Sequence, residues 1–517
     1  FQFAQKKTLV PQSPIPTPQS TSPPDKIAPA HRSPAIEEEE EPTVAMRAPK
    51  RRRSVRADGK QVPPGGGSGL EQGSLDDLDL ISRLPHEVLG TIVSLLPTKE
   101  GARTQVLSRR WFPLWRSPMA PLNLVADDTL SDNDTRVAVI SKILADHPGS
   151  TRHLSLDIIS LPGFPAKVAR WFRSKTLTGL QELGISNWQE RKYQLLPRAL
   201  TRFAPTLTLL NLSYCRFHNR TTLPSFPHLK RLSLYSVGIS DDYLQRLISS
   251  SAVLESVRLS SVRFARLCIN SRTLRSIKLH PLRRKGGELV IEDAPCLERL
   301  LPNFPNDGPA TIRVIQAPKL EMLGFLSEGI STLQLGTSVF QKMIAVNLTT
   351  KMQKMKILAL NTTGAKLGAA IDFLKCFPFL EKLYVVLERG NGMNNSVNYD
   401  PLDPIECLEF HLQKVVLKNY EDDRRAFIDF AKVFVLNAKV LKQMEIGVLN
   451  SVSDKWMCDL RRKLQVENRA SRDAQIELKS DAYACPSSHA YTLGLSVADP
   501  FDSKHAIRFP KIPSPSV

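Results

Sequence analysis

The chain has 517 residues, of which 42% are hydrophobic and 23% are charged, and its formal net charge at pH 7 is +19. These proportions are ordinary for a soluble globular protein with a sizeable core, and at roughly 150 residues per domain the length allows several domains. No segment reaches the ~18 consecutive apolar residues of a membrane span, and the first residues lack the apolar stretch of a signal peptide. We therefore expect neither feature.

Residues 1–75 are predicted to be disordered. They are rich in proline and serine, then carry an acidic run and the basic cluster Lys50, Arg51, Arg52 and Arg53, and they end in a glycine-rich stretch. Such a composition buries too little apolar surface to offset the entropy that is lost on ordering. The basic cluster fits a nuclear import signal on an extended segment, and a solvated charge run is the alternative.

Residues 76–124 are predicted to form a small helical unit. Leu84-Pro85 begins a helix, with proline at an early position where its missing N–H is not needed. Apolar residues then recur with helical spacing until Pro97. This face consists of Val88, Leu89, Ile92, Leu95 and Leu96, and a second apolar series contains Val106, Leu107, Trp111, Leu114 and Trp115. Because so small a unit has little core of its own, we expect it to complete that core against a partner.

The motifs of this unit are LISRLPHEVL from Leu80, LLPTKE from Leu95, TQVLSRRW from Thr104, and Leu114-Trp115. Together they resemble a plant F-box. The resemblance implies binding to a Skp-type adaptor and, through it, to a cullin and a RING subunit. The adaptor-binding residues that it implies are Leu84, Pro85, Val88, Leu89, Ile92, Leu95, Leu96, Leu107, Trp111 and Trp115. The alternative, a helical cap on the next domain, does not explain this combination of motifs.

Residues 125–400 contain a repeated pattern, L-x-x-L-x-L. Copies begin at residues 180, 207, 229, 254 and 274, which are 27, 22, 25 and 20 residues apart. This spacing is typical of leucine-rich repeats. Further degenerate copies are Leu320/Leu323/Phe325, Met355/Leu358/Leu360 and Leu380/Leu383/Val385. Each repeat is expected to supply a short strand with inward apolar side chains, so stacking of the repeats predicts a solenoid.

Residues 401–480 are predicted to end the repeat array. They contain a helical segment from Arg425 to Leu441 and a strand-like segment from Ala474 to Leu478. This order, with NAKVLKQM from Asn437, is similar to the FBD module of plant F-box/leucine-rich-repeat proteins. The expected fold is therefore α/β, with an N-terminal helical F-box, a leucine-rich-repeat solenoid and an FBD-like end. Residues 481–517 form a tail without assignment.

Enzyme motifs are absent from the sequence. It has no HExxH, no phosphate-binding glycine loop after a strand and no GxSxG elbow. The histidines and cysteines show no metal-ligand spacing, so we predict no catalytic residue, metal or cofactor. Cys215 takes the position of its repeat at which a small side chain turns inward, and we expect it to pack rather than react. The seven cysteines form no CxxC pair, which is typical of reduced thiols in the cytosol or nucleus.

The resemblance implies a non-catalytic, substrate-recognition subunit of a Skp–cullin–F-box ubiquitin ligase, located in the nucleus, the cytoplasm or both. One alternative is a nuclear repeat scaffold or nucleic-acid-associated protein outside any ligase, which the basic balance suggests. Because the cations are spread through the repeats and loops, we do not expect nucleic acid as the main ligand. A repeat protein that binds Skp without assembling a ligase is another alternative. Whether a small molecule bridges receptor and target stays open.

The target site is predicted from the repeat pattern. The inward leucines form the core of a solenoid, so recognition should fall to the residues between them. Arg231, Arg258, Arg275 and Lys278, with Ser233 among them, are expected to be exposed on a basic concave surface. Acidic or phosphorylated targets are then the favoured class. The alternative for each of these residues is a solvated strand position without a function.

Overall fold

The computed structural model describes the helical unit, the repeats and the FBD-like region. The predicted disordered region 1–75, with its basic cluster, lies outside the described residues, as does most of the predicted tail. All of the described residues fall within one unit of the chain, Asp79–Val517. They are 81–115, 117, 121–126, 132–157, 159–161, 163–186, 194–196, 198–217, 224–280, 286–302, 309–347, 349, 351–363, 367–388, 399–400, 402–420, 425–448, 453–480, 495 and 497–501.

Short helices form the first described part of the chain, where the apolar spacing predicts them. After η2 (Ile81–Arg83), α1 (His86–Leu95) begins behind Pro85 and ends before Pro97, which has no N–H to continue the helix. The next elements are α2 (Thr98–Arg103), η3 (Thr104–Val106) and α3 (Phe112–Trp115). The small core of this unit is formed by Leu89, Val93, Trp111 and Leu114, with Leu84 and Trp115 packed against it.

Hydrogen bonds join the helical unit to β1 (Leu122–Val125). The Thr98 hydroxyl donates to the Asn123 carbonyl at 2.6 Å, and the Asn123 amide donates to the Ser94 carbonyl at 2.8 Å. All three side chains are buried. Because a buried polar group without a partner destabilises a fold, these paired groups hold the helices against the first strand.

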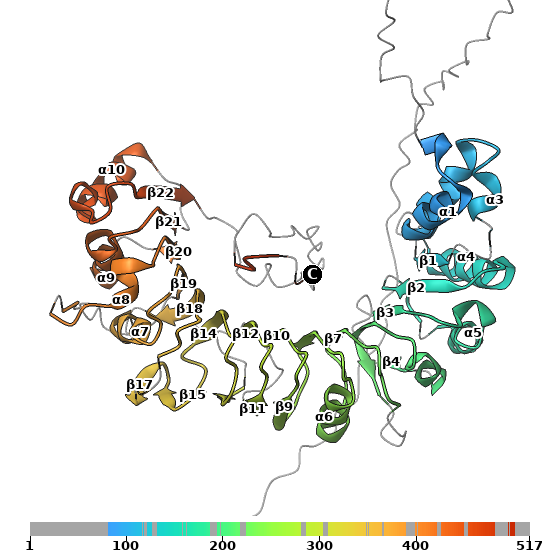
Figure 1. Cartoon of the computed structure of the whole chain (residues 1–517), viewed down its shortest axis with the longest axis horizontal. Coiled ribbons are helices and arrows are strands. Elements are labelled where there is room, and N and C mark those ends of the chain that lie inside the picture. The colour runs from blue at the N-terminus through green and yellow to red at the C-terminus, as the bar shows by residue number, and fades with distance from the viewer. Residues whose placement is uncertain are drawn as a thin grey trace, which may run out of the picture. The chain divides into compact units, whose positions relative to one another are not determined.

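One long parallel sheet carries the repeats (Figure 1). Within the described residues it has 14 strands, and their order in the sheet follows their order in the chain because each repeat adds a strand beside the previous one. The strands are β1, β2 (Thr151–Leu156), β3 (Glu182–Ser186), β5 (Leu209–Ser213), β7 (Arg231–Tyr235), β8 (Ser256–Ser260), β10 (Ser276–Leu279), β12 (Arg299–Pro302), β14 (Met322–Ser327), β18 (Ile357–Thr363), β19 (Lys382–Glu388), β20 (Lys414–Tyr420), β21 (Gln443–Val448) and β22 (Gln475–Ser480).

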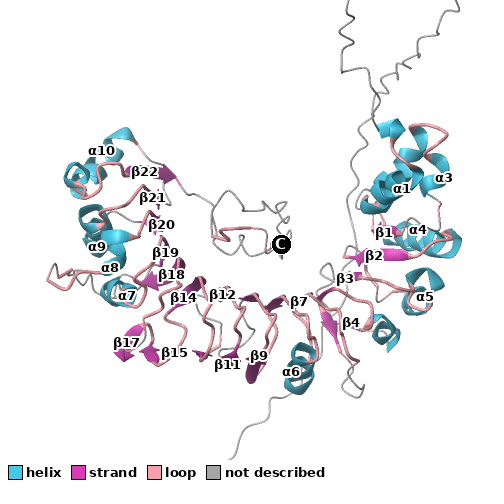
Figure 2. Cartoon of the chain, viewed as in Figure 1, coloured by secondary structure: helices cyan, strands magenta, loops and turns pink. Residues whose placement is uncertain are grey.

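The connections between these strands form a second layer on one side of the sheet (Figure 2). Towards both ends of the array this layer contains helices, α4 (Asn133–Asp146), α5 (Pro165–Trp171), α6 (Asp241–Ser249), α7 (Leu367–Leu374), α8 (Glu406–Phe410), α9 (Arg425–Asn437) and α10 (Asp454–Lys463), with the 3-10 turns η4 (Lys175–Leu177), η5 (Arg198–Phe203) and η7 (Val466–Asn468). In the middle it is a six-stranded sheet, with a small pair, β4 (Gln194–Leu195) and β6 (Cys215–Arg216), nearby in the chain. Its strands are β9 (Arg266–Asn270), β11 (Glu288–Asp293), β13 (Thr311–Val314), β15 (Thr332–Leu335), β16 (Ser338–Gln341) and β17 (Ile344–Asn347).

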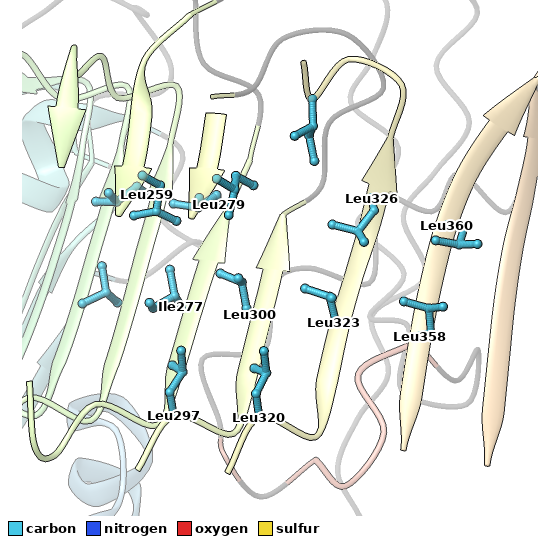
Figure 3. Close-up of a cluster of buried hydrophobic side chains, with 14 of the residues drawn as sticks. Leu259, Ile277, Leu279, Leu297, Leu300, Leu320, Leu323, Leu326, Leu358 and Leu360 are labelled. Carbon is cyan, nitrogen blue, oxygen red and sulfur yellow. The ribbon is translucent and has the colours of Figure 1, made fainter. Parts of the chain in front are cut away.

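The main core lies between the two layers. Leucine and isoleucine side chains from successive strands stack there, as Figure 3 shows for Ile277, Leu300, Leu323 and Leu358. Each fully buried side chain of this size stabilises the fold by about 1.5–3 kcal/mol. The repeating apolar positions therefore form one continuous core, which confirms the α/β repeat fold that the leucine spacing predicts.

The repeat that begins at Leu320 differs from the prediction at its third position. Leu326 enters the main core, whereas Phe325 packs in a second cluster on the other face of the sheet. The register between β14 and β18 shifts between Leu323 and Leu326, at Gly324. Gly324 has a φ of +130°, and a Cβ there would lie 2.1 Å from the Ala359 carbonyl oxygen. Only glycine allows this irregularity, which reverses the face that Phe325 occupies.

The FBD-like region continues the long sheet instead of forming a separate one. β20, β21 and β22 extend the sheet, each parallel to the strand before it. α9 confirms the predicted helix and ends at Asn437, a few residues before the predicted boundary. Its Phe427, Phe430 and Phe434 side chains are buried in the main core.

Candidate protein-interaction surfaces

The predicted adaptor-binding residues divide into exposed and buried groups. Val88, Ile92 and Leu95 lie on α1 with 42%, 37% and 59% of their surfaces exposed, and Leu107, after η3, is 64% exposed. Pro85 is also exposed. Val88, Ile92 and Leu95, spaced by four and three residues, share one side of α1 and form an apolar surface on a unit whose own core is very small. Exposed apolar groups gathered in this way are typical of a protein-interaction site.

The other predicted adaptor-binding residues are not free to contact a partner in the same way. Leu89 and Trp111 are buried in the core of the helical unit, with 0% and 6% of their surfaces exposed, which corrects their assignment as contact residues. Leu84, Leu96 and Trp115 are half-buried. The helical spacing places Leu89 on the same side of α1 as Ile92, but packing against α3 buries only the former. Leu89 and Trp111 therefore support the exposed residues from the core and are not themselves part of the surface.

The second candidate surface is the side of the long sheet that faces away from the main core, here called the helix-free face. Along each strand, successive side chains point to opposite sides. In β10, for example, Ile277 and Leu279 enter the main core, so Ser276 and Lys278 lie on the helix-free face. Figure 2 shows α4 to α10 on the other side of the sheet. A predicted target-binding residue therefore lies on this face only if it is in a strand and alternates with the residues that enter the main core.

Arg275 does not lie on this face. It precedes β10 and sits at the edge of the sheet, where its guanidinium donates to both carboxylate oxygens of Glu298 at 2.9 and 3.0 Å. Residues at the equivalent position of other repeats form similar pairs, such as Lys356 with Glu321 at 3.3 Å. The assignment of Arg275 to a concave recognition surface is therefore corrected: it belongs to a row of edge ion pairs.

Arg258 and Lys278 do lie on the helix-free face, but they are buried, not exposed. Their surfaces are 8% and 5% exposed, and the two residues are direct neighbours on β8 and β10. Arg299, on β12, is 6% exposed. Burial, followed by the charges of Arg258 and Arg299, lowers the pKa of Lys278 from 10.5 to about 8. On β7 the direct neighbour of Arg258 is Ser233. Arg231 lies two residues earlier, in the row that contains Arg299, is half-buried and pairs with Glu182 at 3.3 Å.

An apolar patch continues this face beyond Arg299. It consists of Leu301, Met322, Phe325, Ile357, Ala359, Tyr384, Val386 and Val416, which form one buried cluster with Phe501. No motif in the sequence marks this patch. One of its strands, β12, does not match the L-x-x-L-x-L pattern, because Pro302 follows Leu297 and Leu300 at the position of the third leucine. The pattern at Leu380/Leu383/Val385 was found, and the intervening Lys382 and Tyr384 could have been assigned to this face by alternation alone.

Cys215 and Cys407 are packing groups of the main core. Cys215 is fully buried and its thiol donates to the Ser213 carbonyl at 3.2 Å. Burial raises the pKa of Cys215 and of Cys407 to about 12, so both thiols are protonated and poor nucleophiles. Within the described ranges, no cluster of three or more His, Cys, Asp or Glu residues could hold a metal ion. A search of the same ranges finds no helix with the length and apolar character to cross a membrane.

Two protein families match the chain. The family described as "FBD-associated F-box protein At5g56370, LRR repeats" matches residues 168–385, and the FBD family matches residues 400–446. The first range contains the strands from β3 to β18 and most of β19. The second contains α8, β20, α9 and most of β21. Both matches therefore coincide with the sheet whose helix-free face is described above.

Several curated proteins of Arabidopsis thaliana are similar to the chain. F-box/LRR-repeat protein At3g03360 is 27% identical over 60% of this chain and 65% of its own length. F-box/FBD/LRR-repeat protein At2g26030 is 24% identical over 77% of this chain and 98% of its own length. FBD-associated F-box protein At1g60410 is 30% identical over 43% of this chain and 56% of its own length. The chain thus spans less than two thirds of the first and third of these relatives.

Proposed function

Because the chain carries the leucine-rich-repeat and FBD domains of the FBD-associated F-box proteins, we propose that it is a substrate-recognition subunit of a Skp–cullin–F-box ubiquitin ligase. In this function α1 to α3 form an F-box that binds a Skp-type adaptor, and the repeats bind the protein to be ubiquitinated. The chain would act as a non-catalytic adaptor in the nucleus, the cytoplasm or both.

The exposed apolar surface of the helical unit carries this proposal. Val88, Ile92 and Leu95 are exposed on one helix although each is a residue that usually lies in a core. A partner that covers them gains about 25 cal/mol for every Å² of apolar surface removed from water. The same unit is bonded to β1 through Thr98 and Asn123, so a bound adaptor would be held next to the repeats.

The proposed mechanism is proximity. An adaptor on α1 and a target on the repeats are linked through one chain, which raises the effective concentration of the target lysines at the ubiquitin-charged conjugating enzyme. The chain itself makes and breaks no bond in this mechanism. What it supplies is two binding surfaces, the spacing between them, and the choice of target.

Co-purification with a Skp-type adaptor tests the F-box assignment. The double variant Val88→Ala/Ile92→Ala removes exposed side chains, so we expect it to capture the adaptor at least tenfold more weakly, which corresponds to about 1.4 kcal/mol. The matched control is Val139→Ala, because Val139 is a similarly exposed apolar residue, 38% exposed, on α4. Unchanged capture by the double variant would show that this surface is not the adaptor site.

The same preparation separates the rival functions. A ligase subunit brings down the cullin together with the adaptor, whereas a repeat protein outside a ligase brings down the adaptor alone. A nucleic-acid-associated protein would show affinity that falls steeply as salt increases, since phosphate contacts release counterions. Adaptor capture that withstands moderate salt and includes the cullin supports the proposed function over both alternatives.

A further inference from the structure

We propose that the helix-free face between β12 and β19 binds a peptide segment with an acidic residue two positions before an aromatic residue, and that the chain's own Asp499–Phe501 segment occupies this site in the absence of a target. This inference rests on the proposed function, and it specifies which class of target segment the repeats would bind. It also makes the C-terminal segment an internal competitor of the target.

The acidic residue is held by two side chains of β19. Asp499 is 5% exposed, and one oxygen of its carboxylate accepts hydrogen bonds from the Lys382 ammonium at 2.8 Å and the Tyr384 hydroxyl at 2.9 Å. Its other oxygen accepts from the Phe501 backbone N–H at 3.1 Å. Pro500 lies between them with a restricted φ. The carboxylate therefore both binds the sheet and fixes the turn that directs the aromatic ring.

The aromatic residue fills the apolar patch. Phe501 is 5% exposed, and its ring lies 5.1 Å from the ring of Phe325, edge to face, and 5.6 Å from that of Tyr384. Phe325 is available for this contact only because Gly324 moves it out of the main core. Aromatic pairs in this geometry add specificity to the burial of apolar area. The patch thus favours an aromatic side chain over a small one.

Arg299 binds the backbone of the same segment. Its guanidinium donates to the carbonyl oxygens of Val497 at 2.8 Å and Leu495 at 3.0 Å. β12 and β19 are separated by β14 and β18, so the two strands that hold the segment lie about 14 Å apart at ~4.8 Å per strand. Arg299 therefore holds the backbone of the segment through carbonyl oxygens, which every residue type carries.

These contacts have the features of a peptide-binding site. A buried aromatic anchor, a buried carboxylate with two donors and a backbone clamp all converge on one short segment, the red stretch on the helix-free side of the sheet in Figure 1. The cluster around Phe501 is separate from the main core, so the repeats do not depend on the segment for their packing. A target that presents the same groups can make the same contacts, and the segment must leave first.

A labelled peptide tests this inference on the full chain. The probe is a fluorescein-labelled peptide with the sequence of residues 494–502, GLSVADPFD, and its binding is measured by fluorescence anisotropy. The variant Asp499→Ala/Phe501→Ala releases the site, so we expect it to bind the peptide at least tenfold more tightly than the wild-type chain. A peptide in which the aspartate at position 499 and the phenylalanine at 501 are replaced by alanine should not bind. Equal binding of GLSVADPFD to both proteins, or to neither, overturns the proposal.

Variants on the sheet side provide the controls. When added to the variant Asp499→Ala/Phe501→Ala, Lys382→Met and Tyr384→Phe should each weaken peptide binding at least tenfold. Lys356→Met is the matched control, because Lys356 pairs with Glu321 at the sheet edge and does not touch the segment. Thermal unfolding establishes that each variant is folded, and Phe501→Ala alone replaces the double variant if that one is unstable. If Lys356→Met weakens binding as much as Lys382→Met, the peptide is held by general charge and the assigned site is wrong.

The two proposals fail separately. Loss of adaptor capture with retained peptide binding overturns the ubiquitin-ligase function and leaves the peptide site. Retained adaptor and cullin capture without peptide binding overturns the peptide site and leaves the ligase function.

Discussion

Lys278 lies directly opposite Arg258 on neighbouring parallel strands, and both cationic side chains are buried on the helix-free face of the sheet. Removing like charges from water beside one another is unfavourable. Burial and the charges of Arg258 and Arg299 accordingly lower the pKa of Lys278 from 10.5 to about 8. The helix-free face therefore holds a group that titrates in a range where an ordinary lysine does not.

This lysine should make stability depend on pH in a defined direction. Between pH 8 and 10.5 the unfolded chain keeps a proton that folded Lys278 has lost, so the free energy of unfolding rises with pH through this window. Below pH 8 the unfavourable contribution is fully present, roughly 2–4 kcal/mol. Lys278→Met should raise the urea midpoint at pH 7 and flatten its rise towards pH 10. A rise of the same steepness in both proteins would assign the effect to other groups.

Leu89 and Ile92 should separate folding of the helical unit from binding of the adaptor. Leu89 is fully buried, so Leu89→Ala should destabilise the unit by about 2–5 kcal/mol and increase amide hydrogen exchange throughout α1. Ile92 is 37% exposed, so Ile92→Ala should change exchange little while weakening adaptor capture. The comparison is made by hydrogen-exchange mass spectrometry on the full chain. Equal exchange in the two variants would contradict the burial of Leu89.

Gly324 is predicted to be essential for the structure of β14. A Cβ at this position would lie 2.1 Å from the backbone oxygen of Ala359, and the φ of +130° is unfavourable for any side chain. Because backbone cannot move aside as a flexible side chain can, Gly324→Ala should lower stability by roughly 3 kcal/mol or more.

Gly368→Ala is the matched control for this change. Gly368 lies in α7, and a Cβ there meets nothing within 4 Å. Since alanine favours the helix over glycine, the control should raise stability by about 0.5–1 kcal/mol. Thermal unfolding of both variants measures the difference. A similar, small effect of the two substitutions would show that β14 tolerates a regular register.

The basic cluster Lys50–Arg53 is predicted to direct nuclear import. Import receptors recognise closely spaced cations on an extended chain, so replacing Lys50, Arg51, Arg52 and Arg53 by alanine should move a fluorescent fusion from nucleus to cytoplasm. The separate basic run Arg461–Lys463 on α10 offers a control, because its alanine variant removes cations from a folded helix. An unchanged distribution of the first variant would leave the cluster as a solvated charge run.

The spacing of apolar residues by itself determined the repeats, the first helix and the α/β class. A strand with one buried face must place apolar side chains at alternate positions, and a helix must place them three or four residues apart, so both patterns are visible without coordinates. The strands at Leu232/Leu234 and Ile277/Leu279 follow this logic. Phe325 does not, because the irregularity at Gly324 depends on how closely β18 approaches.

The tertiary structure alone decided which side chains are available at the surfaces. Leu89 and Ile92 are equivalent in the helical pattern, and only packing against Trp111 and Leu114 separates the core residue from the exposed one. Asp499 and Lys382 are 117 residues apart, and their contact depends on the path of the whole chain between them. The spacing of apolar residues along the chain shows which side of a helix or strand must be buried. Contacts between distant segments arise only when the complete sheet is assembled.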